Sequence, residues 1–224
     1  IISEGADLGI AFDGDGDRVL FADRHGELVD GDELLFVIAR HAVAGSAGNT
    51  GVVGTQMSNL GLEVALGELN IPFARAQVGD RYVKELMVAE GWSLGGESSG
   101  HIICGDLSTT GDGVIAALQV LAAVQTSSKT LEALTDGFRP LPQVLVNVKI
   151  SRGFDLNAHS GINDACRRVE SLLEGRGRLL LRPSGTEPVI RVMVEGDEGF
   201  SFSHEDFFIE EGRVLGGWVS GRGD

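Results

Sequence analysis

The sequence predicts an α/β fold class on two observations. Between about residues 27 and 136, apolar strand-like runs alternate with segments of helical periodicity, the pattern of repeating β-turn-α units. Phe138-Arg139-Pro140-Leu141-Pro142 then has the composition of a linker, because two prolines flank one residue. We therefore expect one complete α/β domain with a mixed sheet before the linker and a smaller α+β domain after it.

The elements before the linker follow from local periodicity and turn residues. Strands are predicted at 8–12, 19–22, 51–54 and 71–74, and helices at 30–43, from 58 or 59 to 69, from 79–80 onward and at 113–124. Asp30 is expected to cap the first helix, because its side chain can accept hydrogen bonds from free N–H groups of the first turn. Leu34, Leu35, Ile38 and Ala39 recur at helical spacing and predict its buried face.

Beyond the linker the sequence predicts a strand, a helix and two further strands. Their expected ranges are 144–150, 163–173, 177–181 and 189–194. The last segment, 197–224, is atypical: Phe200, Phe202, Phe207 and Phe208 cluster there without 3.6-residue periodicity. We expect this tail either to be disordered or not to be native to the fold.

Composition excludes several classes of function. The chain has 224 residues, 42% of them hydrophobic and 23% charged, with a net charge of −15. This charge disfavours non-specific binding to nucleic acid or to an anionic membrane. The longest apolar stretch, 114–124, is too short to span a bilayer. Cys104 and Cys166 lack the spacing of a metal site, so we expect a cytoplasmic protein with reduced thiols.

Asp13-Gly14-Asp15-Gly16-Asp17-Arg18 is the most informative motif of the chain. Alternate side chains of an extended backbone point the same way, so Asp13, Asp15 and Asp17 are expected to converge. Their mutual repulsion favours a bound cation, and carboxylate ligands suit Mg²⁺. The alternatives are an ordinary Asp-Gly turn and a calcium EF-hand, and the EF-hand is excluded because its sixth and twelfth positions hold Arg18 and Arg24.

Gly95-Gly96-Glu97-Ser98-Ser99-Gly100-His101 forms a second chemically rich loop. A carboxylate, hydroxyls and an imidazole suit a polyol, whose hydroxyl groups both donate and accept hydrogen bonds. Glu97 can accept from two neighbouring hydroxyls, and His101 can contact substrate or move a proton near neutral pH. The alternative is a polar turn with a surface histidine.

Arg182-Pro183-Ser184-Gly185-Thr186-Glu187-Pro188, followed by Arg191, forms a third loop. Guanidinium groups, hydroxyls and backbone N–H groups together can bind a phosphate. The alternative is a β-turn with exposed arginines. In Gly79-Asp80-Arg81, a weaker candidate, Asp80 can simply cap a helix. The three loops together indicate a phosphosugar substrate.

These three loops, in this order, resemble the α-D-phosphohexomutase family, and the resemblance covers residues 1–196. Supporting stretches at 54–59, 78–83, 109–113 and 143–148 are most similar to members that act on glucosamine phosphate. The family's four-domain plan implies that 1–26 is the end of domain 2, 27–138 is domain 3, 139–196 is domain 4, and 197–224 is an atypical tail. It also places the phosphoserine before Ile1, so we expect an incomplete enzyme that is inactive without its N-terminal half.

The resemblance implies interconversion of glucosamine 6-phosphate and glucosamine 1-phosphate through a phosphoserine and a sugar bisphosphate, which also serves as activator. It implies Mg²⁺ on Asp13, Asp15 and Asp17, and catalytic roles for Arg18 and His101. The substrate-binding residues that it implies are Glu97, Ser99, His101, Arg182, Ser184, Gly185, Thr186 and Arg191.

Three other functions remain as alternatives. The first is phosphomannomutase or phosphoglucomutase activity, because these substrates differ only at C2 of the sugar. The second is a phosphatase in which Asp13 attacks phosphate and Asp15 is the acid/base. The third is a non-catalytic, metal-dependent module that binds sugar phosphates.

Overall fold

The computed structural model describes residues 1–45, 51–151, 154, 156, 160–173, 175–184, 187–197, 200–201, 208–210, 213–215 and 220–221. The chain divides into two compact units, Ile1–Pro140 (unit 1) and Leu141–Asp224 (unit 2). The division falls inside the proline-flanked segment 138–142. Among the described residues, no helix is long and apolar enough to cross a membrane.

Unit 1 contains two sheets. Its strands are β1 (Leu8–Phe12), β2 (Val19–Asp23), β3 (Leu28–Val29), β4 (Val52–Thr55), β5 (Phe73–Ala76), β6 (Leu94–Gly96) and β7 (Ile102–Cys104). Strands β1, β2 and β3 form an antiparallel sheet in that order. The second sheet has the order β5-β4-β6-β7, in which β4 runs parallel to β5 and β6 while β7 is antiparallel to β6. The expected mixed sheet and α/β class are confirmed.

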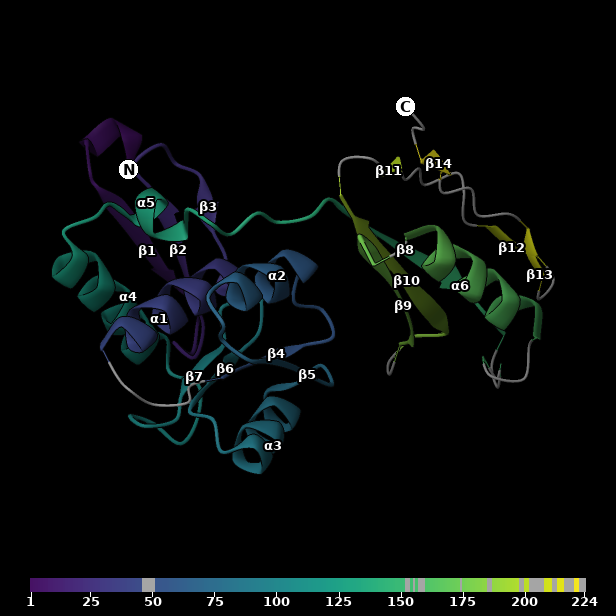
Figure 1. Cartoon of the computed structure of the whole chain (residues 1–224), viewed down its shortest axis with the longest axis horizontal. Helices are drawn as coiled ribbons and strands as arrows, with labels where there is room; N and C mark the ends of the chain where they lie inside the picture. Colours follow the sequence, from purple (N-terminus) through teal and green to yellow (C-terminus); the bar gives the residue numbers. More distant parts are fainter. Residues whose placement is uncertain are drawn as a thin grey trace. The chain divides into compact units, whose positions relative to one another are not determined.

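Helices cover both faces of the mixed sheet. They are α1 (Gly31–Gly45), α2 (Leu60–Glu68), α3 (Asp80–Glu90), α4 (Gly113–Ser127) and α5 (Leu131–Thr135), preceded by the 3-10 helix η1 (Ile2–Glu4). Figure 1 shows α1 and α2 on one side of β4, β5 and β6, and α3 on the other. Val52 and Val53 of β4 are both buried, one in the core beneath α1 and the other in the core beneath α3. A strand that is covered on both faces has a continuous run of apolar residues in its sequence.

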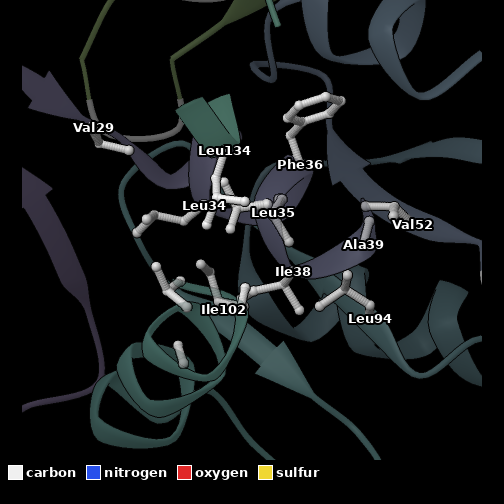
Figure 2. Close-up of a cluster of buried hydrophobic side chains, with 14 of the residues drawn as sticks. Val29, Leu34, Leu35, Phe36, Ile38, Ala39, Val52, Leu94, Ile102 and Leu134 are labelled. Atoms are coloured by element: carbon white, nitrogen blue, oxygen red, sulfur yellow. The ribbon is translucent and has the colours of Figure 1, made fainter. Parts of the chain in front are cut away.

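Helix α1 lies at the centre of the larger core. Its buried side chains pack against other elements of unit 1, including Ile102 of β7 (Figure 2). These side chains are Leu34, Leu35, Ile38 and Ala39, as expected. The expected cap is confirmed, because Asp30 Oδ1 accepts hydrogen bonds from the N–H groups of Asp32 and Glu33 at 2.9 and 3.2 Å. Glu33 Oε2 accepts in return from the Asp30 N–H, which completes a capping box.

Several short elements were not expected from the sequence, namely β3, β6, β7 and α5. Strand β6 is Leu-Gly-Gly, which has the composition of a loop. Its Gly95 is needed because α3 approaches so closely that a Cβ there would lie 2.8 Å from Met87 Sδ and 2.9 Å from Val83 Cγ1. Glycine therefore marks close packing in a buried strand here rather than a turn.

Unit 2 is a three-stranded antiparallel sheet with one helix. The order is β8-β10-β9, formed by β8 (Gln143–Lys149), β9 (Gly177–Pro183) and β10 (Val189–Gly196), and the helix is α6 (Ser160–Leu173). Val169 and Leu173 of α6 pack against Val194 and Leu179. Because side chains alternate along a strand, Arg191 projects from the sheet face opposite to Val192 and Val194.

The tail contains short strand pairs rather than being irregular throughout. Strand β11 (Phe200–Ser201) pairs with β14 (Ser220–Gly221), and β12 (Phe208–Glu210) pairs with β13 (Arg213–Leu215). Phe202 and Phe207 of the phenylalanine cluster lie outside the described residues.

Candidate active site

Asp13, Asp15 and Asp17 come together in the connection between β1 and β2. One carboxylate oxygen from each lies within 4.8 Å of the others. The convergence arises from a turn, not from the extended backbone expected from the sequence, and Gly16 adopts a φ of 74° within it. Three oxygen donors at this spacing fit a hard divalent cation such as Mg²⁺, which binds carboxylates and retains several waters.

The loop stabilises its own conformation through Asp13. Its Oδ1 accepts hydrogen bonds from the N–H groups of Gly16 and Arg18 at 3.1 and 3.2 Å. The Arg18 guanidinium remains half exposed, with Nε 3.9 Å from Asp13 Oδ2. Arg18 is therefore positioned beside the carboxylate cluster with most of its donors available to an anion.

Asp17 is connected to the second loop by a long-range hydrogen bond. Its Oδ2 lies 2.8 Å from His101 Nδ1, and His101 is only 6% exposed. This hydrogen bond with His101 is the main cause that holds the pKa of Asp17 below its usual value. His101 was expected to contact substrate; its ring is buried beside Asp17, and its Nε2 has no hydrogen-bond partner among the described residues.

Glu97 and Ser99 lie in the turn between β6 and β7. The Gly100 N–H donates to the Glu97 carbonyl at 3.0 Å, and Ser99 Oγ donates to Glu97 Oε2 at 3.4 Å. Glu97 Oε1 also accepts from the Gly79 N–H at 2.9 Å, so Glu97 fixes the loop that begins α3. Ser99 is exposed and Glu97 is half-buried, which leaves both accessible to a ligand.

Backbone hydrogen bonds join the segment 13–19, which holds the three aspartates, to the turn 97–101 (the Glu97 loop) and to the starts of α1 and α4. The Val19 N–H donates to the Gly100 carbonyl, Gly113 donates to Gly16, and Gly31 donates to Ser98, at 3.1, 3.0 and 3.0 Å. Gly100 has a φ of 89°, and a Cβ there would lie 2.1 Å from the Val19 carbonyl oxygen. These segments of unit 1 therefore form one connected site.

Gly31, Gly111 and Gly113 were not expected to belong to the site, although 109–113 is one of the family-like stretches. Their residue type was the one available sign of a role, since a glycine is required where two backbones approach closely. The weaker candidate Arg81 is exposed, and its Nε donates to Glu85 Oε1 at 2.8 Å within the same helix.

In unit 2, the register of β9 and β10 places Arg182 directly opposite Arg191. The Ser184 N–H donates to the Val189 carbonyl at 2.9 Å, and Ser184 Oγ accepts from the Glu187 N–H at 3.3 Å. These bonds close the turn between the two strands. Gly185 and Thr186 lie outside the described residues.

Two family models match the chain. Phosphoglucomutase/phosphomannomutase, alpha/beta/alpha domain III, matches residues 30–141, and the C-terminal domain of the same family matches residues 145–200.

Curated relatives carry the name phosphoglucosamine mutase. The protein from Teredinibacter turnerae is 58% identical over 198 residues, which are 88% of this chain and 44% of the relative. The protein from Alkalilimnicola ehrlichii is 60% identical over 193 residues, which are 86% of this chain and 43% of the relative. The chain thus spans less than half the length of these relatives.

Solved structures share the fold. Aspergillus fumigatus N-acetylphosphoglucosamine mutase, in complex with GlcNAc-6P and magnesium, matches with a TM-score of 0.70 and 23% identity over 85% of this chain and 48% of that one. A phosphoglucomutase/phosphomannomutase family protein from Burkholderia thailandensis matches with a TM-score of 0.66 and 22% identity, over 88% of this chain and 45% of that one.

Proposed function

The chain belongs to the phosphoglucomutase/phosphomannomutase family, and from this premise we propose that it is the metal-, sugar- and phosphate-binding part of a phosphoglucosamine mutase. The proposed reaction interconverts glucosamine 6-phosphate and glucosamine 1-phosphate through a phosphoserine and a sugar bisphosphate. The choice of amino sugar follows the relatives at 58–60% identity, which carry this activity in their names.

The observation that carries the proposal is the junction of two loops within unit 1. The cluster of Asp13, Asp15 and Asp17 is joined to the Glu97 loop by the contact between His101 and Asp17. The proposed cation site and the groups proposed to bind hydroxyls therefore belong to one framework. This is what transfer of a phosphoryl group to or from a sugar hydroxyl requires.

Six of the candidate site residues in unit 1 have a direct role in this proposal. Asp13, Asp15 and Asp17 would hold one Mg²⁺, which supplies positive charge that offsets the negative charge of the transferring phosphoryl group. Arg18 would donate hydrogen bonds to the same group, since its guanidinium is half exposed. Glu97 and Ser99 would bind sugar hydroxyls. The ring of His101 is buried beside Asp17, and its expected contact with substrate stays a prediction.

Unit 2 would bind the phosphate that does not react. Arg182 and Arg191 are neighbours across two strands, and two guanidinium groups provide paired donors for phosphate oxygens. Ser184, Gly185 and Thr186 of the adjoining loop would add hydroxyl and N–H donors.

The phosphoserine would come from the part of the relatives that this chain does not cover. We therefore expect no turnover from the chain alone, and turnover once a phosphoserine-bearing N-terminal half from a related mutase is supplied. Phosphoryl transfer by this hybrid is the test of the proposal. The assay compares glucosamine, glucose and mannose 1-phosphates with Mg²⁺ and a bisphosphate activator, and a hybrid carrying Asp15→Asn is the control.

Preference for the amino sugar supports the proposal. Turnover of only glucose or mannose phosphate replaces it with a phosphoglucomutase or phosphomannomutase function. Calorimetric binding of glucosamine 6-phosphate by a folded hybrid without turnover favours the non-catalytic binding module. An aspartyl-phosphate trapped on Asp13 favours the phosphatase instead.

A further inference from the structure

His101 occupies an unusual place for a residue of a substrate-binding loop. Its Nδ1 lies 2.8 Å from Asp17 Oδ2, across 84 residues of sequence. An ionised carboxylate only accepts hydrogen bonds, so Nδ1 is the donor. His101 Nε2 is buried and has no hydrogen-bond partner among the described residues, with Asp80 Oδ2 at 4.0 Å.

The imidazole is held in place by Gly111. A Cβ at Gly111 would lie 2.2 Å from His101 Nε2, 2.4 Å from Cε1 and 2.7 Å from Cδ2. The ring therefore rests on the bare backbone of Gly111. The neighbouring Asp112 N–H donates to the Ile102 carbonyl at 3.4 Å, which holds this segment against the strand that follows His101.

The contact with His101 affects the orientation of the Asp17 carboxylate. A carboxylate has two oxygens, so Asp17 can accept from His101 with one and offer the other to a cation. Asp13 is fixed by the N–H groups of its own loop, whereas the strongest interaction of the Asp17 side chain, ahead of those with Asp13 and Asp15, is with His101 from a distant segment. The orientation of Asp17 thus depends on His101, and the orientation of His101 depends on Gly111.

We propose that His101 is a positioning residue that holds Asp17 ready to bind the cation, and that Gly111 is required because only glycine leaves room for the ring. The inference rests on the proposed metal site. Outer-shell hydrogen bonds of this kind orient metal ligands, and their loss typically weakens metal binding by about 10- to 100-fold.

Calorimetric titration of Mg²⁺ and Mn²⁺ into the full chain tests this inference without any turnover assay. His101→Asn and His101→Gln form a matched pair, because the Asn amide nitrogen lies near the position of Nδ1 whereas that of Gln lies near Nε2. Gly111→Ala moves the ring without changing its chemistry. Gly67→Ala is the control, because a Cβ there meets nothing within 4 Å. Circular dichroism checks the fold of each variant.

The expected result is a dissociation constant raised by about 10- to 100-fold in His101→Gln and Gly111→Ala, most of the affinity retained in His101→Asn, and none lost in Gly67→Ala. Unchanged cation affinity in folded His101→Gln overturns the positioning role and leaves the metal site intact. Absence of cation binding by the unsubstituted chain overturns both the inference and the metal site of the proposed function.

Discussion

Arg182 and Arg191 lie directly opposite each other on neighbouring antiparallel strands. Like charges in a cross-strand pair are destabilising, by a few tenths to about 1 kcal/mol. A fold that retains such a pair beside a hydroxyl-bearing turn is suited to binding an anion between the two guanidinium groups.

Arg191→Gln removes this repulsion together with half of the proposed phosphate site. In phosphate-free buffer we expect the variant to be more stable than the unsubstituted chain, by up to about 1 kcal/mol. Added inorganic phosphate should raise the unfolding temperature of the unsubstituted chain and leave that of the variant nearly unchanged. Thermal unfolding with and without phosphate measures both effects. The exposed Arg168→Gln on α6 is the control, and an equal response to phosphate in Arg191→Gln contradicts the phosphate site.

The contact between Gly100 and Val19 predicts a large loss of stability on adding one methyl group. Gly100→Ala combines an unfavourable φ of 89° with a Cβ only 2.1 Å from a carbonyl oxygen. Gly91→Ala has a comparable φ of 69° but meets nothing within 4 Å. We expect about 1 kcal/mol of destabilisation in Gly91→Ala and at least about twice that in Gly100→Ala. Urea unfolding gives both values, and equal losses would show that the close approach has no energetic weight.

Asp32 makes part of the stability depend on pH. This residue of α1 is 2% exposed, and burial raises its pKa from 3.8 to about 7, while its Oδ2 accepts a hydrogen bond from the Asn59 N–H at 2.8 Å. Because the folded pKa lies above the unfolded one, the contribution of Asp32 is most favourable below pH 4 and is lost as the pH rises to about 7.

Asp32→Asn should remove this loss, since an amide oxygen can still accept from Asn59 and carries no charge to bury. Relative to the unsubstituted chain, the free energy of unfolding of the variant should increase between pH 4 and pH 7, by at most about 4 kcal/mol. Urea unfolding across this range measures the difference. The exposed Asp106→Asn is the control, and a difference independent of pH argues against a raised pKa at Asp32.

Glu97 should protect the Gly79 amide from hydrogen exchange. Its Oε1 accepts from that N–H at 2.9 Å, and hydrogen bonds to charged groups contribute about 1.5–3 kcal/mol. We expect Glu97→Ala to speed exchange at Gly79 by about tenfold or more, and Glu97→Gln to have a smaller effect because its amide oxygen can still accept. Exchange at Trp92, whose N–H donates to the Met87 carbonyl, is the internal reference.

Local patterns in the sequence predicted those parts of the fold that local chemistry determines. The cap by Asp30 and the buried face of α1 follow from side chains within one or two turns of helix. The sequence also placed Asp13, Asp15 and Asp17 together, although a turn brings them together rather than an extended backbone.

Contacts between distant segments could not be predicted from local sequence. His101 stands in a polar, glycine-rich loop, which suggests exposure, yet it is buried because the backbone of Gly111 packs against its ring and Asp17 lies on its other nitrogen. In the same way, Asp32 looks like a solvated residue in the first turn of a helix, and its burial depends on the Ser58–Asn59 turn that follows β4. The burial of His101 and that of Asp32 both depend on how the fold brings together loops that are distant in the sequence.

The hydrogen bonds of Gly100 with Val19, Gly113 with Gly16, and Gly31 with Ser98 have a consequence for protein engineering. If one of these loops were replaced by the loop of another family member, a single inserted residue would displace the backbone groups to which the other loops are hydrogen-bonded. Altered sugar preference is therefore best obtained by transplanting these segments together as a single cassette, with their glycines retained.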